Sequence, residues 1–312
     1  MLGLMLDAVV IISLVGLALQ SLYAPSLFRS ILHFVVFGLA MSLAWARLNT
    51  PDLALAEAAI GAGVTGALVL VAFRRLIAIQ PDQDKPSTES RSRLALPIAL
   101  GAGLLVAILG LATVNIETLP AAAGVAVLNN LSSTGLENPI TAVLLSFRGI
   151  DTLLEITVLL AALLSAQAVT RPDALEKSIV TQNPDTPLIG GLLAIIIPLT
   201  VLVSIHLLKA GSESSGGAFQ AGALLAAGGV ILALTGRLSP SQQPSLRLNL
   251  GLLLGLLTFI VMGLLPLLNG QPLLALPEPW AIYLLESTMM ISIALILLLL
   301  FTGSISLRHR RG

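Results

Sequence analysis

Long apolar stretches alternate with short polar ones along the chain. A helix rises about 1.5 Å per residue, so crossing the apolar core of a bilayer takes about 20 predominantly apolar residues. The pattern predicts nine membrane-spanning helices. They are residues 4–22, 30–48, 53–73, 94–114, 149–169, 187–208, 218–236, 248–268 and 281–301.

Two polar segments divide these helices into groups. Residues 75–93 (RLIAIQPDQDKPSTESRSR) and 170–187 (TRPDALEKSIVTQNPDTP) combine charges with proline and serine, which is typical of solvated linkers. They separate blocks of three, two and four spans, and no internal repeat is evident. We therefore expect units at residues 1–80, 81–180 and 181–312.

The region between the fourth and fifth spans, residues 115–148, is too polar at its centre to cross a membrane. Residues 120–128 and 139–147 are apolar enough for short helices that lie in the interface or enter the membrane part-way. Irregular backbone at that depth needs protein or water as a hydrogen-bond partner.

Composition supports an all-α integral membrane protein. The chain is 56% hydrophobic and 10% charged, with a mean hydropathy of +0.98, whereas soluble domains carry about 25% charged residues. A net charge of zero gives no reason to expect nucleic acid. Without cysteine, and with three scattered histidines, no disulfide or protein-only metal site is expected, and no cofactor. Residues 1–22 lack a basic start and contain Asp7, so they predict a first span rather than a signal peptide.

The placement of lysine and arginine predicts the orientation. With nine spans the two termini lie on opposite sides of the membrane. Thirteen of the sixteen basic residues then fall on one side, and only Arg47, Arg148 and Lys209 on the other. Because basic residues concentrate in cytoplasmic segments, we expect the C-terminus inside the cell and the N-terminus outside.

Several charged residues stand within the predicted spans. A charge at the centre of a bilayer costs roughly 2.5–3.5 kcal/mol, and intramembrane ionisable residues mark ion or proton pathways. Glu57, Glu155 and Glu286 lie deepest and are too short to reach the interface, so we expect buried roles for them. Burial favours the neutral form of a carboxyl group, which suits proton exchange.

The stretch SFRGIDTLLEI, residues 146–156, concentrates three of these charges. Asp151 and Glu155 are spaced i, i+4 and share one helix face, and Arg148 stands where it can pair with Asp151. Arg148, Asp151 and Lys209 also lie near enough to helix ends to reach the interface, which is the alternative interpretation. His206 ends the sixth span on the predicted outer side, and His33 is the exception near an inner end.

A glycine-rich junction, AGSESSGGAFQAG at residues 210–222, leads into the seventh span. Gly216 and Gly217 permit either a tight turn with close helix approach or an open helix start whose N–H groups face a polar partner. The GK[ST] signature of a phosphate-binding loop does not follow.

Four stretches together resemble subunits of Mrp-type sodium/proton antiporters. NTPDLALAEAAIGAGVTGALVL (49–70) resembles a PDLALTE-type motif near the end of the large subunit, and SFRGIDTLLEITVL (146–159) resembles the FRGFDTLGEI-type motif that follows it. GSESSGGAFQAGALLAAGGVIL (211–232) resembles the GHNxPGGGFQGG-type signature of the MnhB domain, and YLLESTM (283–289) the acidic start of its last helix. Ser212, Ser215, Ala218 and Leu154 depart from these motifs.

The resemblance implies a non-enzymatic transport subunit. It implies a fusion of the C-terminal region of the large subunit, similar to the D and E subunits of membrane-bound hydrogenases, with an MnhB domain. The implied ion or proton pathway comprises Glu57, Asp151, Glu155, Glu286, Asp52, His33 and His206. The implied supporting residues are Arg148, Lys209, Pro51, Gly149, Gly216, Gly217, Phe219 and Gln220.

The implied partners are the large proton-pumping and the small subunits of the antiporter, the lipid bilayer, and Na⁺ and H⁺ as transported ions. The implied location is the plasma membrane of a prokaryote. Two alternatives remain open from the sequence: the same module within a membrane-bound hydrogenase or a relative of NADH dehydrogenase, and a purely structural scaffold. A stand-alone transporter is disfavoured because no inverted repeat is evident.

Overall fold

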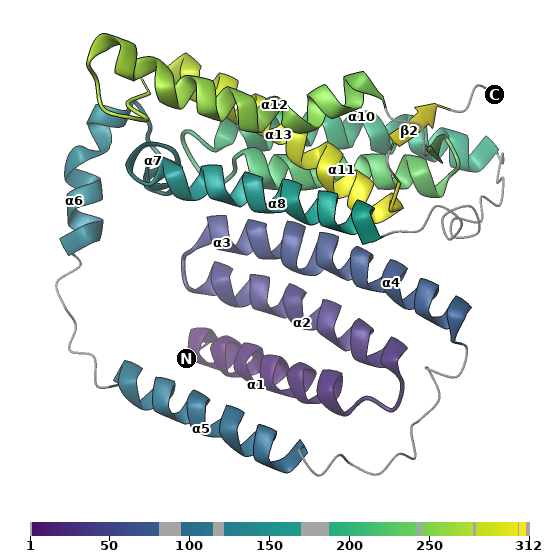
Figure 1. Ribbon diagram of the computed structural model, residues 1–312. Helices are drawn as coiled ribbons and strands as arrows, with labels where there is room; N and C mark the ends of the chain where they lie inside the picture. Colours follow the sequence, from purple (N-terminus) through teal and green to yellow (C-terminus); the bar gives the residue numbers. More distant parts are fainter. Residues whose placement is uncertain are drawn as a thin grey trace.

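The computed structural model describes residues 2–80, 95–114, 122–169, 187–241, 245–276, 279–304 and 306–309. These residues are almost entirely helical (Figure 1). The first half of the chain forms α1 (Leu2–Tyr23), α2 (Leu27–Arg47), α3 (Pro51–Ala56), the π-helix η1 (Glu57–Val64), α4 (Thr65–Ile79), α5 (Ala95–Val114), α6 (Ala122–Asn130), the 3-10 turn η3 (Leu131–Thr134), α7 (Pro139–Ala142), the π-helix η4 (Val143–Phe147) and α8 (Gly149–Val169).

The second half forms α10 (Pro187–Ala210), α11 (Ala218–Leu234), α12 (Leu246–Leu264), the 3-10 turn η5 (Leu265–Asn269) and α13 (Pro279–Thr302). Two short strands, β1 (Leu238–Ser241) and β2 (Ser306–His309), pair antiparallel with Leu238 opposite His309.

Each of the nine predicted spans overlaps a helix, and the third is continuous through α3, η1 and α4. Seven described helices are long and apolar enough to cross a membrane. The two remaining predicted spans coincide with the shorter apolar helices Leu100–Ala112 and Ala218–Leu234. The chain is therefore an integral membrane protein by its helices, while a total of nine crossings stays a prediction.

The structure corrects the first predicted linker, which does not begin at residue 75. α4 continues to Ile79, because Arg74 and Arg75 are followed by the apolar run Leu76–Ile79 and the helix ends only at Gln80. The later part of this linker and nearly all of the second lie outside the described residues. Short helices are present where two were expected: α6 overlaps residues 120–128, and α7 with η4 covers 139–147.

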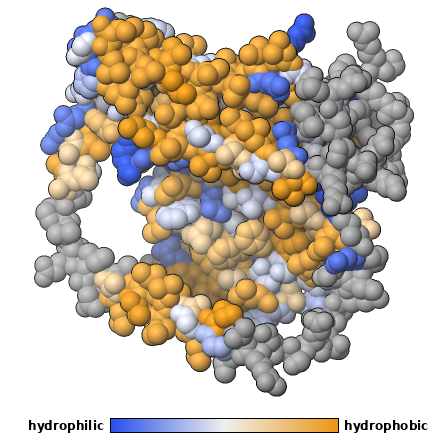
Figure 2. Space-filling model, viewed as in Figure 1, coloured by the Kyte–Doolittle hydropathy of each residue, from blue (hydrophilic) through white to orange (hydrophobic). Residues whose placement is uncertain are grey.

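The helices lie side by side as a layered bundle (Figure 1). α5, α1, α2 and the α3–η1–α4 helix form a row, α8 lies beside it, and α10, α11, α12 and α13 pack together beyond α8. α11 contacts α3 and η1, and α13 contacts α4, α8, α11 and α12. Hydrophobic residues cover most of the described surface on the face shown in Figure 2, as expected for contact with lipid.

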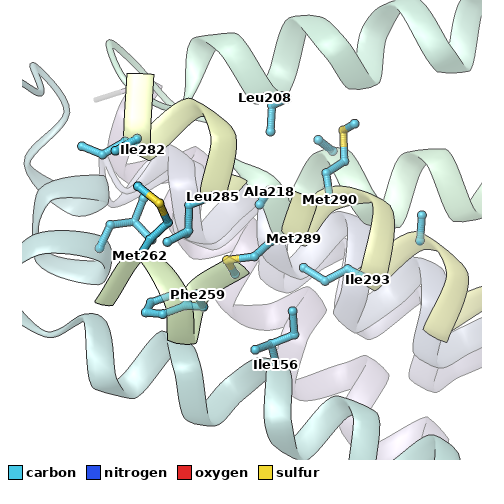
Figure 3. Packing of buried hydrophobic residues seen from close by; sticks show 14 of the residues in the cluster. Ile156, Leu208, Ala218, Phe259, Met262, Ile282, Leu285, Met289, Met290 and Ile293 are labelled. Carbon is cyan, nitrogen blue, oxygen red and sulfur yellow. The ribbon is translucent and has the colours of Figure 1, made fainter. Parts of the chain in front are cut away.

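The core centres on α13. Of its most apolar window 72% is buried inside the molecule, against 0% for α1. Leu285, Met289 and Ile293 of α13 pack against Phe259 of α12 and Ile156 of α8 (Figure 3). A Cβ atom at Gly255 of α12 would lie 2.9 Å from the Met289 Cα atom, so glycine is needed for α12 and α13 to approach this closely.

Two side chains bond to the C-terminal end of α13. Arg75 Nη2 of α4 donates to the Thr302 carbonyl at 3.2 Å, and Gln167 Nε2 of α8 donates to the Ser304 carbonyl at 3.2 Å. The last carbonyls of a helix have no partner within the helix, and cations there also interact favourably with the helix dipole. α4 and α8 are thereby tied to α13 at this end of the bundle.

Candidate functional site: an acidic cavity at the start of α11

A cavity of about 400 Å³ lies where the N-terminal ends of α3, α8 and α11 approach the first turns of α13. Three carboxylates line it: Asp52, Glu155 and Glu286. Most of its other lining is apolar, with residues such as Leu53, Ile60 and Met289. The cavity is thus an acidic space enclosed by helices that are far apart in the sequence.

Glu286 is the most deeply buried of these carboxylates. It lies seven residues after the start of α13, and only 3% of its surface is exposed. The main-chain N–H of Ala218, the first residue of α11, faces its carboxylate. Its Oε2 atom is buried and has no hydrogen-bond partner among the residues that the structure describes. A carboxylate at a helix N-terminus is stabilised by the free N–H groups and the dipole of the helix.

The glycine loop, which we define as Gly211–Gly217, connects α10 to α11 and turns back against α10. Leu207 O of α10 accepts hydrogen bonds from Gly211 N at 3.2 Å and from Gly217 N at 2.9 Å. A Cβ atom at Gly211 would lie 2.7 Å from the Gly217 main chain, and one at Gly216 would overlap the Leu207 carbonyl. Glycine is therefore required where the loop folds onto the helix end.

Gly217 has a backbone conformation that favours glycine. Its φ of 121° lies where residues with a side chain are strained. A Cβ atom there would lie 3.3 Å from Glu286 Oε1. Both sequence-based interpretations of this junction are present in the structure, since the turn is tight and the start of α11 faces a carboxylate.

Asp52 holds the glycine loop from the side of α3. Its Oδ1 atom accepts a hydrogen bond from Gly216 N at 3.2 Å, and its Oδ2 atom accepts one from Ser215 Oγ at 3.3 Å. Asp52 was expected on the ion pathway. The structure places it in the cavity wall with both carboxylate oxygens bonded to the loop.

Asn138 and Thr141 hold the glycine loop from the side of α7. Asn138 Nδ2 donates to Ser214 O at 2.7 Å and to Gly211 O at 3.2 Å, and Thr141 Oγ1 donates to Gly211 O at 2.5 Å. The sequence analysis did not name either residue. The Asn–Pro pair at 138–139 is a helix-start signal, but a local signal contains no information about a partner more than 70 residues later.

The cluster Arg148, Asp151 and Glu155 divides in two. Arg148 Nη2 and Asp151 Oδ2 form the expected ion pair at 2.6 Å, with the side chains 69% and 45% exposed. Glu155 lines the cavity together with Thr152, and Asp151 does not. Asp151 therefore pairs with Arg148 outside the cavity. Of the two carboxylates on α8, Glu155 is the one that lines the cavity. Glu155 was expected to be buried, but its position at the cavity wall leaves it exposed.

Glu57 is the first residue of the π-helix η1 and is half-buried. Ala56 and Ile60 line the cavity, and Glu57 does not. Its carboxylate instead folds back along η1, in the space that a Cβ atom at Gly61 would occupy. π-helical segments are rare and are frequent at functional sites.

The other predicted residues lie at various distances from this cavity. Phe219 and Gln220 line it from α11. Gly149 is buried at the start of α8 against Leu274, and Pro51 is exposed at the start of α3. His206 and Lys209 are exposed near the end of α10. His33 is half-buried on α2, and its Nδ1 atom has no partner among the described residues.

The three carboxylates do not converge on one point. Among the residues that the structure describes, no group of three histidine, aspartate or glutamate side chains is arranged to hold a metal ion. The cavity therefore brings three carboxylates to one largely apolar space without a metal-binding group among the described residues.

Two family models match the chain. Residues 12–77 match MbhD, described as the D subunit of MBH, and residues 188–307 match MnhB, a domain related to the MnhB subunit of the Na⁺/H⁺ antiporter. The first match contains Asp52 and Glu57, and the second contains the glycine loop and Glu286.

A curated protein and two solved structures are also similar. The chain is 27% identical over 171 residues to the A subunit of the Na⁺/H⁺ antiporter of Bacillus subtilis (strain 168), which covers 55% of this chain but only 21% of that protein. The Mrp complex from Dietzia sp. DQ12-45-1b matches 95% of this chain and 34% of the matched chain with a TM-score of 0.75 and 21% identity. The membrane-bound sulfane sulfur reductase, an archaeal respiratory membrane complex, matches 67% of this chain and 96% of the matched chain with a TM-score of 0.55 and 22% identity. At these identities the solved structures establish the fold.

Proposed function

Since the chain joins an MbhD-type segment to an MnhB-type domain, we propose that it serves as a membrane subunit of a multisubunit Mrp-type antiporter that exchanges Na⁺ for protons. The similar Bacillus protein is the A subunit of a Na⁺/H⁺ antiporter, and this chain spans about a fifth of its length. A part of that size supports a role within a larger complex rather than as a complete exchanger.

The observation that carries the proposal is the acidic cavity. Asp52 belongs to the MbhD-type segment, Glu286 to the MnhB-type domain, and Glu155 to the helix between them. Carboxylates within membrane helices are expensive to bury and are found where ions or protons move. Three of them around one enclosed space, one with an unpartnered buried oxygen, support an ion or proton pathway through this junction.

The proposal includes a topology. The chain crosses the membrane nine times in units 1–80, 81–180 and 181–312, with its N-terminus outside and its C-terminus in the cytoplasm. The cavity then opens toward the outer side, because α3, α8, α11 and α13 all begin there. Glu57, Asp151, His33 and His206 belong to the same pathway before or after the cavity. Arg148 and Lys209 support it near the outer surface.

The proposed setting is the plasma membrane of a prokaryote, in a complex with large proton-pumping subunits and with small subunits. The chain itself catalyses no chemical reaction, and ion gradients drive transport.

A second candidate is supported by the archaeal respiratory complex. One chain of that redox complex aligns over 96% of its length with this chain. The same module would then couple ion movement to redox chemistry in partner subunits. Neighbouring genes distinguish the two settings, because antiporter subunits alone would accompany the first and hydrogenase or quinone oxidoreductase subunits the second. A scaffold without transport is the third possibility.

The substitutions Glu155→Gln and Glu286→Gln test the proposal. In membrane vesicles containing the assembled complex, we expect either substitution to reduce Na⁺/H⁺ exchange to roughly a tenth or less. A tenfold loss of rate requires the activation free energy to rise by only about 1.4 kcal/mol. Asp7→Asn is the matched control, because this carboxylate on α1 pairs with Arg47 of α2 and does not line the cavity. Unchanged exchange in both variants would remove the cavity from the pathway. Loss of assembly on native gels, with normal exchange per assembled complex, would support the scaffold.

A further inference from the structure

Asn138 uses both amide donors and the amide oxygen of its side chain. It is 4% exposed and stands immediately before α7, where its Oδ1 atom accepts a hydrogen bond from Ile140 N at 2.9 Å. Its two N–H groups point to the carbonyls of Gly211 and Ser214 in the glycine loop. A flipped amide would place its oxygen against both carbonyls, so the pattern of partners fixes the orientation.

The main chain next to Asn138 strengthens the same contact. The N–H groups of Glu137 and Asn138 both donate to Ser212 O at 3.0 Å. Thr141, 5% exposed, adds its hydroxyl to the Gly211 carbonyl. These carbonyls follow the end of α10, where the α10 helix supplies no N–H partners for them. The segment before α8 thus provides five donors to three carbonyls of one loop.

The glycine loop determines where α11 begins. Its last residue, Gly217, precedes Ala218, whose N–H faces the Glu286 carboxylate in the cavity. Asp52 bonds to the loop on the α3 side, but only at Ser215 and Gly216. Leu207 O of α10 holds Gly217 N from the other side. A shift of the Gly211–Ser214 part of the loop would pull on these contacts and so move the start of α11 relative to Glu286.

We propose that Asn138 is a positioning residue, whose side-chain amide sets the glycine loop so that α11 starts against Glu286 and the cavity keeps its affinity for the transported cation. The effect on transport rests on the proposed function. The effect on the position of the loop does not, so the two are measured separately.

Thiol labelling measures the position of the loop. The chain has no cysteine, so Ser212→Cys introduces a single thiol. Ser212 is 6% exposed and its hydroxyl has no partner among the described residues, so the thiol is expected to be protected in the assembled complex. Adding Asn138→Asp replaces the two amide donors with a carboxylate facing two carbonyls. Because unsatisfied or repelling buried groups are costly, we expect labelling by a maleimide to become about tenfold faster or more.

Asn130→Asp is the matched control. Asn130 lies on α6, is exposed, and among the described residues donates to Ala126 O within its own helix. Asn130→Asp makes the same chemical change at a residue that does not contact the glycine loop. The introduced thiol should therefore be labelled at the same rate as in the Ser212→Cys parent. The ratio of the Asn138→Asp rate to the parent rate should also fall as the pH is lowered, because a protonated carboxyl group regains one donor. A general loss of structure would not follow pH in this way.

Na⁺/H⁺ exchange in vesicles then tests the consequence for the cavity. We expect Asn138→Asp to raise the half-saturating Na⁺ concentration by about tenfold at normal levels of assembled complex, and Asn130→Asp to leave it unchanged. If Asn138→Asp reduces assembly, Thr141→Val takes its place, with a smaller effect expected from the loss of one donor.

Unchanged labelling would overturn the positioning role of Asn138. If Asn138→Asp speeds labelling but leaves the half-saturating Na⁺ concentration unchanged, the position of the glycine loop does not determine the affinity of the cavity for the cation, and that part of the proposal is overturned. If the parent complex carries out no exchange, the proposed function fails, and the labelling rates alone decide whether Asn138 positions the loop.

Discussion

Asp52 Oδ1 accepts a hydrogen bond from the Gly216 main-chain N–H at 3.2 Å, although 164 positions separate the two residues. This bond joins the MbhD-type segment to the glycine loop of the MnhB-type domain. It places an acidic residue of one unit where it controls the backbone of another. The acidic cavity is therefore built by contacts between units, and predictions about it concern those contacts.

Changes at Asp52 should affect stability through the loop. Asp52→Ala leaves the Gly216 N–H without an acceptor, which costs about 1–3 kcal/mol for a buried donor. Asp52→Asn keeps one acceptor oxygen and should lose less. Thermal unfolding of the detergent-purified complex measures the order. An equal loss in the two variants would show that the charge, rather than the bond to Gly216, stabilises this contact.

Gly217→Ala should be damaging where other glycine-to-alanine changes are not. The φ of 121° is strained for alanine by about 1–3 kcal/mol, and the added methyl group would press on the Glu286 carboxylate. We expect lower thermal stability and slower Na⁺/H⁺ exchange. Gly190→Ala on α10 is the control, because no heavy atom lies within 4 Å of its added Cβ. Normal exchange in Gly217→Ala would mean that α11 can start elsewhere without consequence.

Gly61→Ala tests the position of Glu57 without removing its charge. The new methyl group would occupy the space of the Glu57 carboxylate, which must then move away from η1. If Glu57 serves the pathway from its present position, Gly61→Ala and Glu57→Gln should reduce exchange to a similar extent. Gly16→Ala on α1 has open space around the added atom and serves as the control. A loss in Glu57→Gln without one in Gly61→Ala would show that the carboxylate functions in more than one position.

The Arg148–Asp151 ion pair should contribute little to stability. Both side chains are largely exposed, and exposed ion pairs typically contribute about 0–1 kcal/mol. Arg148→Gln should therefore shift the unfolding temperature only slightly, and high salt should abolish the difference. An unfolding temperature that falls as far as in Asp52→Ala would show that Arg148 is shielded from solvent by another protein of the complex.

Local features of the sequence predicted much of the structure. The apolar runs located the helices, since hydrophobic length is a local property, and α8 covers residues 149–169 as expected. The ion pair of Arg148 with Asp151 followed from i, i+3 spacing, although Arg148 stands just before α8 rather than within it. Gly216 and Gly217 were correctly identified as a special junction, because glycine is selected there by backbone conformation and close packing.

Features that depend on two distant segments could not be predicted. Asp151 and Glu155 share a face by spacing, yet only Glu155 lines the cavity, because segments from distant parts of the chain form the cavity and decide which part of that face meets it. The role of Asn138 depends on a loop 73 residues later. The π-helical turn at Glu57 was not predicted either, and η1 contacts α2 and α11, which lie far apart in the sequence.

The contacts of α13 have a consequence for how such machines assemble. α13 packs against α4, α8, α10, α11 and α12, and Arg75 and Gln167 bond to its end. When such helices belong to separate polypeptides, this interface forms by bimolecular association and depends on the amount of each chain in the membrane. Within one polypeptide the partners face each other at an effective concentration set by the linkers, in the millimolar range for short flexible ones. Covalent linkage thus keeps the three carboxylates of the cavity in fixed stoichiometry, whatever the abundance of the neighbouring subunits.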